Sequence, residues 1–419
     1  MADTKTYNGK WWIPTELDKT EDFRFAGTLT IEGDGSCSLL IKAQPDGNKS
    51  FESIPVFWGE DERGGKYTLF ALTMTQWNVG KSLRYKAKYV ICGIHILSMD
   101  EPFFDECHVE FPYLQTWTGA TMLDIPQDYE ANTFTIEYGK DHVYVEGKLE
   151  TWLHYRVVDR NVCKQGMLEF TSWKETQYHL ISEKHLSIKS FNKYIREFAQ
   201  FLSLALYSKQ NPSVIYFRKK GEENAHRMFF IAPHSQKPFD TVLIPLSMFR
   251  DRLSNFISGY HSAFDKIETL NRYLITSIHF SDFDAPIFIV VAQALEGYYQ
   301  RFLKGKEGVS KRKWEALLNH FEDVKALREC NIDANIVKDT RDTYSHLYIE
   351  KDSKKSNVAE GMDLVMLTQK CRILLTCCLL KEIGMTTEEI SSCFDRNILH
   401  FMVYNVKKYE TEKQNEEMK

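Results

Sequence analysis

The stretch "SFNKYIREFAQFLSLAL" (Ser190–Leu206) marks the point where the hydrophobic period of the sequence changes. Its apolar residues, among them Phe191, Phe198 and Leu202, recur at the spacing of an amphipathic helix. Upstream of it apolar residues alternate as in strands, and well downstream the helical period continues. The sequence therefore predicts an α+β protein in which a β-rich domain precedes an all-α domain.

The upstream residues have the pattern of short strands. "FAGTLTIEGDGSCSLLI" (Phe25–Ile41) alternates apolar and polar residues on both sides of a turn at Gly33-Asp34-Gly35. Further runs rich in β-branched and aromatic residues are "KYTLFALTM", "KAKYVICGIHIL", "TFTIEY" and "HVYVEGKL". Turn residues separate these runs, so we expect a β-rich, sandwich-like domain over residues 1–187.

The rest of the chain is predicted to be mostly helical. Residues 188–250 form a mixed connecting segment, in which "SVIYFRK", "RMFFIAP" and "TVLIPL" resemble strands. Residues 251–405 predict an up-and-down helical bundle, and the charged tail at 406–419 predicts disorder. The expected helices start near Met248 and then cover Ile287–Phe302, Trp314–Leu327, Ile332–Leu347, Val358–Ile383 and a short segment opened by a capping box at Thr386–Glu389.

Bulk composition sets limits on the class of protein. The chain has 419 residues, 43% of them hydrophobic and 26% charged, which is ordinary for two or three globular domains. A net charge of −5 excludes a general basic field for nucleic acid, so any RNA contact requires a local patch. Nine scattered cysteines and the lack of an apolar leader favour a reducing cytoplasm. "ILLTCCLL" (Ile373–Leu380) is too short to span a membrane and predicts a buried helix.

The segment "RDTYSH" (Arg341–His346) holds the most informative polar residues. Residues five apart on a helix diverge by about 140° around its axis, so Arg341 and His346 do not share one face. Asp342 and His346 do share a face, as do Arg341 and Ser345. Either the helix ends near Tyr344, or another helix or another copy of the bundle completes the site.

An arginine and a histidine in one site suit the cleavage of a phosphodiester. Histidine titrates near neutrality and can move the protons, while arginine donates to phosphate oxygens and stabilises the transition state. Asp342, one turn from His346, is placed to hold the imidazole tautomer. The alternative is an ordinary helix end, because the helix dipole alone favours a histidine there.

Two parts of the sequence resemble known families. "RDTYSH" resembles the R-x4–6-H signature of HEPN domains, and "QALEGYYQRF" (Gln293–Phe302) is similar to their second core helix, with Glu296 at the position of an acidic residue. "YNGKWWIP" (Tyr7–Pro14), "FAGTLTIEGDGSCSLLI" and "IPVFWGEDERGGKYTLFAL" (Ile54–Leu72) together resemble the N-terminal domain of ApeA-type bacterial anti-phage proteins. Those proteins carry a HEPN domain at the C-terminus, in the same order as here.

The resemblance implies an activity and its residues. It implies a HEPN endoribonuclease that cleaves RNA through 2′-OH attack, needs no metal or cofactor, and acts in anti-phage defence by abortive infection. Arg341 and His346 would be catalytic, with Asp342, Ser345 and Glu296 in support. HEPN domains commonly dimerise through their bundles, so a homodimer is expected, with the N-terminal domain sensing a phage-derived trigger. The alternative is a non-catalytic HEPN dimerisation or binding module with the same sensing domain.

The segment "RFLKGKEGVSKRK" (Arg301–Lys313) is the strongest basic cluster. It contains six basic residues and one acidic residue, Glu307. We expect it to contact RNA, or else to be a solvated loop between helices. The candidate RNA-binding residues are Lys304, Lys306, Lys311, Arg312 and Lys313.

Two other groups of residues suggest different functions. Cys92, His95, Cys107 and His108 include ligand types for zinc, but Cys92 and His95 lie three apart in a strand and so face opposite sides. We therefore predict no metal site there. The tryptophans of the N-terminal domain suggest sugar binding, although aromatic residues in sheet domains usually fill the core. The candidate platforms are Trp11, Trp12, Trp58, Trp77 and Trp117.

Overall fold

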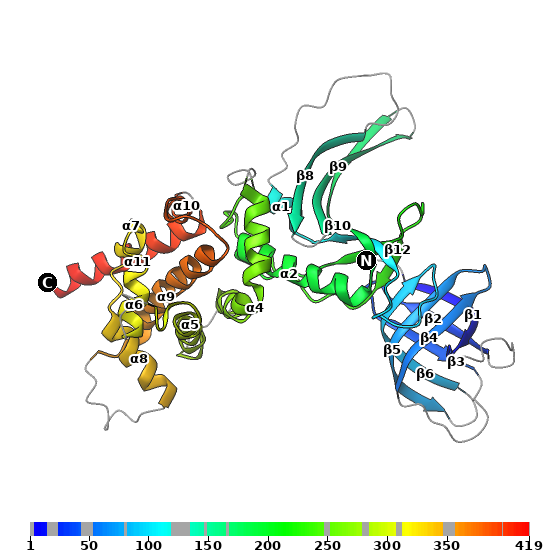
Figure 1. Cartoon of the computed structure of the whole chain (residues 1–419), viewed down its shortest axis with the longest axis horizontal. Coiled ribbons are helices and arrows are strands. Elements are labelled where there is room, and N and C mark those ends of the chain that lie inside the picture. The colour runs from blue at the N-terminus through cyan, green and yellow to red at the C-terminus, as the bar shows by residue number, and fades with distance from the viewer. Residues whose placement is uncertain are drawn as a thin grey trace. The chain divides into compact units, whose positions relative to one another are not determined.

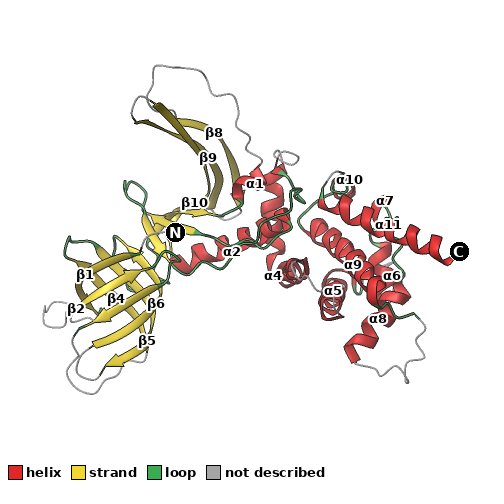
Figure 2. Cartoon of the chain, turned by 180° about the vertical axis from the view of Figure 1, so that it is seen from behind, coloured by secondary structure: helices red, strands yellow, loops and turns green. Residues whose placement is uncertain are grey.

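The computed structural model divides the chain into two compact units. It describes residues 4–14, 24–42, 53–78, 82–118, 135–145, 149–164, 167–246, 252–278, 285–306, 312–346, 357–395 and 397–418. The barrel unit comprises Met1–Leu114, Met122–Arg196 and Asn211–His234, and the helical unit comprises Gln115–Thr121, Glu197–Gln210 and Ser235–Lys419. Figure 1 follows the elements along the chain, and Figure 2 distinguishes helices from strands by colour.

Six antiparallel strands at the start of the chain form a closed barrel. The strand order is β3-β2-β1-β4-β5-β6, and pairing of β3 with β6 closes the sheet. The sequence pattern predicted a sandwich, because inward and outward residues alternate in both architectures. The barrel strands are β1 (Lys5–Trp12), β2 (Phe25–Ile31), β3 (Cys37–Ile41), β4 (Ser53–Asp61), β5 (Lys66–Asn78) and β6 (Ser82–Cys92).

Inward-facing apolar side chains fill the barrel. Trp11, Leu29, Leu39 and Leu69 are completely buried in one cluster. Gly59 is required on β4, since a Cβ atom there would lie 2.0 Å from the ring of Trp11. The apolar residues of the alternating pattern therefore form the packed interior of the barrel. Within it, the indole of Trp11 packs directly against the backbone of β4.

The remaining strands extend the same sheet away from the barrel. β12 pairs with β6, and the order continues β11-β7-β10-β9-β8. "TVLIPL" forms no strand, contrary to its pattern; Leu243 and Ile244 instead donate backbone hydrogen bonds to Ala205, at the end of α2. The added strands are β7 (Phe104–Glu110), β8 (Thr135–Val145), β9 (Leu149–Lys164), β10 (Met167–Leu186), β11 (Val214–Arg218) and β12 (His226–Phe229).

The helical unit is built around one central buried helix. α9 packs against α4, α5 and α11, and its "ILLTCCLL" segment is wholly buried, as predicted. No described helix is long and apolar enough to cross a membrane. The short helix α1 (Leu114–Thr118) precedes the helices α2 (Ile188–Leu206), α4 (Leu253–Ile278), α5 (Ala285–Tyr298), the π-helix η3 (Tyr299–Leu303), α6 (Lys313–Asn319), α7 (Lys325–Arg328), α8 (Ala334–His346), α9 (Gly361–Glu382), α10 (Thr387–Ser392) and α11 (Ile398–Glu417).

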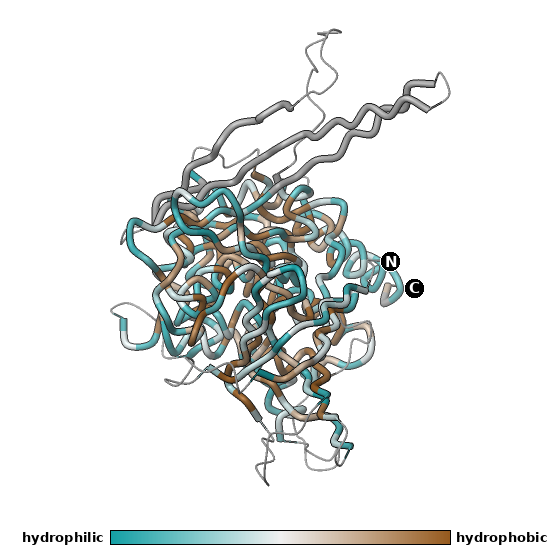
Figure 3. Tube along the Cα trace, turned by 90° about the vertical axis from the view of Figure 1, so that its right-hand side faces the viewer, coloured by the Kyte–Doolittle hydropathy of each residue, from teal (hydrophilic) through white to brown (hydrophobic). Residues whose placement is uncertain are grey.

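Several helices follow the predicted pattern with altered boundaries. The capping box at Thr386 is present, with reciprocal bonds between Thr386 and Glu389. The single helix predicted for Trp314–Leu327 is divided into α6 and α7 by a turn at 320–324. Along the chain trace, hydrophobic and hydrophilic stretches alternate (Figure 3), as expected when each element buries one face.

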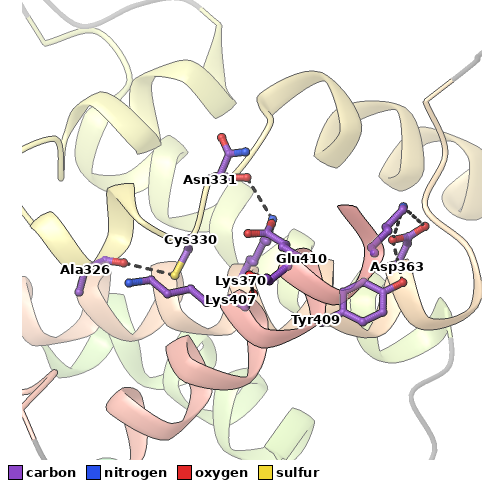
Figure 4. A network of polar contacts seen from close by, with 10 residues as sticks. Ala326, Cys330, Asn331, Asp363, Lys370, Lys407, Tyr409 and Glu410 are labelled. Atoms are coloured by element: carbon purple, nitrogen blue, oxygen red, sulfur yellow. Dashed lines mark hydrogen bonds and ion pairs between the residues drawn. The ribbon is translucent and has the colours of Figure 1, made fainter. Parts of the chain in front are cut away.

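The prediction of a disordered tail over 406–419 is wrong, because α11 continues to Glu417. Ionic contacts compensate for the missing apolar stripe. Figure 4 shows Glu410 beside Lys370, and Tyr409 donating to Asp363. Lys413 also pairs with Asp363, at 2.8 Å. The charged residues of the tail thus bind complementary charges on α9.

Candidate active site

The candidate site begins with α8, which carries the "RDTYSH" segment. The carboxylate of Asp333 starts this helix by accepting the backbone N–H groups of Asn335 at 2.7 Å and Ile336 at 3.3 Å. The helix continues to His346, its last residue, so it does not end near Tyr344. Buried Thr340 accepts the backbone N–H of Ala359 at 2.9 Å, which ties α8 to the residues preceding α9.

Arg341 is held by two carboxylates. Its Nη2 donates to Oε2 of Glu296 at 2.9 Å, and its Nε lies 2.9 Å from Oε1 of the same residue without the alignment of a hydrogen bond. Nη1 donates to Asp342 at 3.2 Å. The side chain of Arg341 is 22% exposed and that of Glu296 16% exposed, so the pair is only partly screened by water. The structure therefore brings together three of the five predicted site residues.

Glu296 is shared between two cations. It lies on α5, shortly before the helix widens into the π-helix η3, a distortion often found at functional sites. Lys313, the first residue of α6, forms an ion pair with Oε1 of Glu296. One carboxylate thus links α5, α6 and α8 and orients both Lys313 and Arg341.

A cleft of about 1070 Å³ lies beside this ion-pair network, between η3, α6 and α8. Asp342 and Lys313 line it, and both contact the Arg341–Glu296 pair. Four of the five predicted RNA-binding residues line the same cleft: Lys304, Lys306, Arg312 and Lys313. The fifth, Lys311, lies outside the described residues. The basic segment is therefore a wall of the cleft next to the arginine.

The α8 face toward the cleft carries two more residues of interest. Lys338 lines the cleft one turn before Asp342, and His346 follows one turn after it on the same side of the helix. Lys338 was not predicted, although its spacing of four from Asp342 was a usable signal. His346 and Ser345 are exposed, and Arg341 diverges from His346 by about 140° around the axis.

A second histidine lies elsewhere in the helical unit. Burial lowers the pKa of His320, and the charges of Lys381 and Lys306 lower it further. Its ring centroid lies 6.4 Å from that of Tyr298. Burial and these charges thus favour the neutral form of His320, and Lys306, a residue of the cleft, contributes to the lowered pKa.

The sequence suggested two other groups of candidate residues, a Cys/His group and the tryptophans of the N-terminal domain. His95 lies 2.9 Å from the carbonyl oxygen of Gly59 through Nε2 and stacks on Trp58, with ring centroids 4.9 Å apart. Within the described ranges, no group of three or more His, Cys, Asp or Glu residues could hold a metal ion. Trp11, Trp12 and Trp117 are buried and so cannot serve as sugar platforms; Trp77 is 50% exposed.

These features define a protein whose β-barrel unit is joined to a helical bundle with an arginine–carboxylate site beside a basic cleft. A family model described as ApeA N-terminal domain 1 matches residues 6–260, and one described as Apea-like HEPN matches residues 289–389. The chain belongs to the ApeA N-terminal domain 1 family and is an ApeA-like protein with a C-terminal HEPN domain. Among the curated proteins and the solved structures, nothing matches it significantly.

The family matches bear on the site and its chemistry. Glu296, Arg341, Asp342 and His346 all fall within the HEPN match, as does the basic segment. A HEPN domain behind an ApeA N-terminal domain supports a nuclease-type function in defence against phage.

Proposed function

We propose that the helical unit is a metal-independent endoribonuclease of anti-phage defence, with Arg341 and His346 as its catalytic residues. The observation that carries the proposal is the contact of Arg341 with Asp342, which lines a cleft together with several basic side chains. Asp342 touches both the arginine and the cleft, and His346 follows it by one turn. The family matches support the same chemistry.

In this reaction the RNA supplies its own nucleophile. The 2′-oxygen attacks the adjacent phosphorus, a P–O2′ bond forms and the P–O5′ bond breaks, leaving a 2′,3′-cyclic phosphate and a 5′-hydroxyl. One histidine removes the proton from the 2′-OH, and a protonated histidine gives a proton to O5′. Of the five guanidinium N–H donors, three face Glu296 and Asp342, which leaves two for the phosphate oxygens.

The divergence of Arg341 and His346 on one helix favours a site shared by two chains. A second copy of the bundle, related by twofold symmetry, could place its His346 beside Arg341 of the first. Two histidines in one composite site also provide the acid and the base that the reaction needs. We propose that the homodimer forms through the helical unit and that the barrel unit responds to a phage-derived trigger.

The test uses purified full-length protein with EDTA and a mixed RNA pool. We expect cleavage products with cyclic phosphate and 5′-hydroxyl ends, and a loss of about 10²–10⁴-fold in rate for His346→Ala. Arg341→Lys keeps the charge but loses the fork of donors, so it should also be impaired. In growing bacteria, overexpression should arrest growth unless Arg341 or His346 is replaced. Equal cleavage by His346→Ala contradicts the assignment.

A non-catalytic binding module is the second candidate. It is favoured by the two carboxylates that already surround the guanidinium of Arg341. Their negative charges offset that of the arginine, which therefore stabilises the negative charge of a transition state less strongly. Under this alternative the bundle binds RNA without cutting it, and overexpression of the parent and of His346→Ala has the same effect on growth.

A further inference from the structure

The basic side chains that line the cleft belong to two classes. Arg312 pairs with Glu315 at 3.0 Å and Lys313 pairs with Glu296, so their charges are partly compensated. Lys304, Lys306 and Lys338 are exposed and form no ion pair with any carboxylate in the described part of the chain. These last three, which we name the lysine tract, carry the uncompensated positive charge of the cleft.

The backbone fixes where the lysine tract lies. Lys304 ends the π-helix η3, and its N–H donates to the carbonyl of Tyr299 at 2.8 Å. Gly305 follows with φ of +81°, a conformation suited to glycine, and turns the chain so that Lys306 also reaches the cleft. Lys338 approaches from α8, one turn before Asp342. Two walls of the cleft therefore supply the tract.

Among its described residues, the cleft has charged side chains but no exposed aromatic ring on which a base could stack. Its described aromatic residues, Tyr299 and Trp314, are each only 6% exposed and belong to the core of the bundle. Proteins that read single-stranded bases usually stack them on exposed aromatic rings. A volume of about 1070 Å³ suits a short single strand, whereas double-stranded RNA is bound along a face of about 16 base pairs.

We propose that the lysine tract binds the phosphate backbone of single-stranded RNA and delivers it to Arg341 independently of base identity. This inference deepens the proposed nuclease function, because it names how the substrate is held and adds Lys338 to the residues that hold it. Asp342, which lines the cleft and contacts Arg341, marks where the bound strand would meet that arginine. Since only phosphates are contacted, single-stranded DNA should occupy the same tract.

The salt dependence of binding gives the size of the effect. Neutralising a phosphate of a single strand contributes about −0.7 to the slope of log K against log salt. Three lysines therefore contribute about −2 to that slope. Between 50 and 200 mM salt the parent should lose roughly 20-fold more affinity than a variant without the tract.

The experiment measures fluorescence anisotropy of labelled single-stranded oligo(dT) and oligo(dA), which lack the 2′-OH and cannot be cleaved by this reaction. The test variant is Lys304→Gln/Lys306→Gln/Lys338→Gln in the full-length chain. The control variant loses the same charge at Lys189, Lys325 and Lys408, which are exposed and pair with nearby carboxylates outside the cleft. We expect a flatter salt slope for the test variant alone, and oligo(dT) and oligo(dA) affinities within threefold, our chosen limit of roughly 0.65 kcal/mol.

Each contrary outcome overturns the inference. Equal slopes for parent and test variant exclude the tract, as does an equal change in the control variant or a failure of the parent to bind. A preference above threefold for one base excludes recognition by phosphate alone. His346→Ala should bind as the parent does; if binding depends on the tract but no RNA is ever cut, the nuclease proposal fails while the lysine tract stands.

Discussion

The ion pair between Glu296 and Arg341 predicts a measurable coupling within the helical unit. Glu296→Gln keeps the shape of the side chain but removes the charge that contacts two nitrogens of Arg341 and the amine of Lys313. Breaking a fully buried pair costs about 3–5 kcal/mol, and breaking an exposed pair at most about 1 kcal/mol. The side chains of Glu296, Arg341 and Lys313 are 16%, 22% and 33% exposed, so the cost of breaking these contacts lies between the two limits.

We therefore expect Glu296→Gln to lower the free energy of unfolding by about 2 kcal/mol. A change of this size lowers the Tm of a unit of 150–250 residues by roughly 4–8 °C. The assay is thermal unfolding of the full chain followed by circular dichroism at a helical wavelength. The two units need not unfold together, so the helical transition is fitted separately.

A double-mutant cycle separates the pair from its surroundings. Arg341→Gln alone leaves Glu296 with Lys313, and the double variant removes both partners. If the two residues interact as the geometry indicates, the double variant loses less than the sum of the single variants, by at least about 1 kcal/mol. Additive effects within about 0.5 kcal/mol would refute the reasoning, because contacting charges should not behave independently.

Three further predictions concern other parts of the molecule. Burial lowers the pKa of His95, so protonation of this residue favours the unfolded state. The barrel unit should therefore lose stability as the pH falls below about 6.5. Urea midpoints measured at several pH values should show this loss in the parent and not in His95→Gln. Thr386→Ala removes the capping box of α10 and should cost about 1 kcal/mol in urea unfolding. Truncation after Val406 removes the contacts of Tyr409, Glu410 and Lys413 and should lower the stability of the helical unit by about 1–2 kcal/mol, whereas loss of a disordered tail would leave its melting curve unchanged.

The order of strands and helices along the chain was predictable from local patterns, but the closure of the barrel was not. The alternation around Gly33–Gly35 and the helical period after Ser190 depend on neighbouring residues, which a single sequence displays. The pairing of Cys37 with Ala87 that closes the barrel joins residues fifty apart and leaves no local trace. The prediction of a disordered tail failed for a related reason. The helix of the tail is stabilised by carboxylates and amines on α9 rather than by an apolar stripe of its own.

The candidate site was predictable only where family resemblance supplied distant residues. Spacing alone related Asp342 to His346, but the contact of Arg341 is with Glu296, forty-five residues earlier. The resemblance singled out Glu296, while nothing in the sequence indicated that Lys313 would share its carboxylate. Lys338 was missed although it lies four residues before Asp342, because that spacing was not linked to a cleft until the fold placed one beside α8.

Arg341 and His346 of the "RDTYSH" segment lie on different faces of α8. Because α8 continues to His346, the divergence of about 140° between the two residues persists in the folded chain. Arg341 is directed toward α5 and bound by Glu296, while His346 is exposed at the end of the helix. A single chain thus holds a positioned phosphate-binding group and an exposed proton carrier on different faces. That arrangement favours our proposal that cleavage requires two copies of the bundle, so activity should fall on dilution as the dimer dissociates.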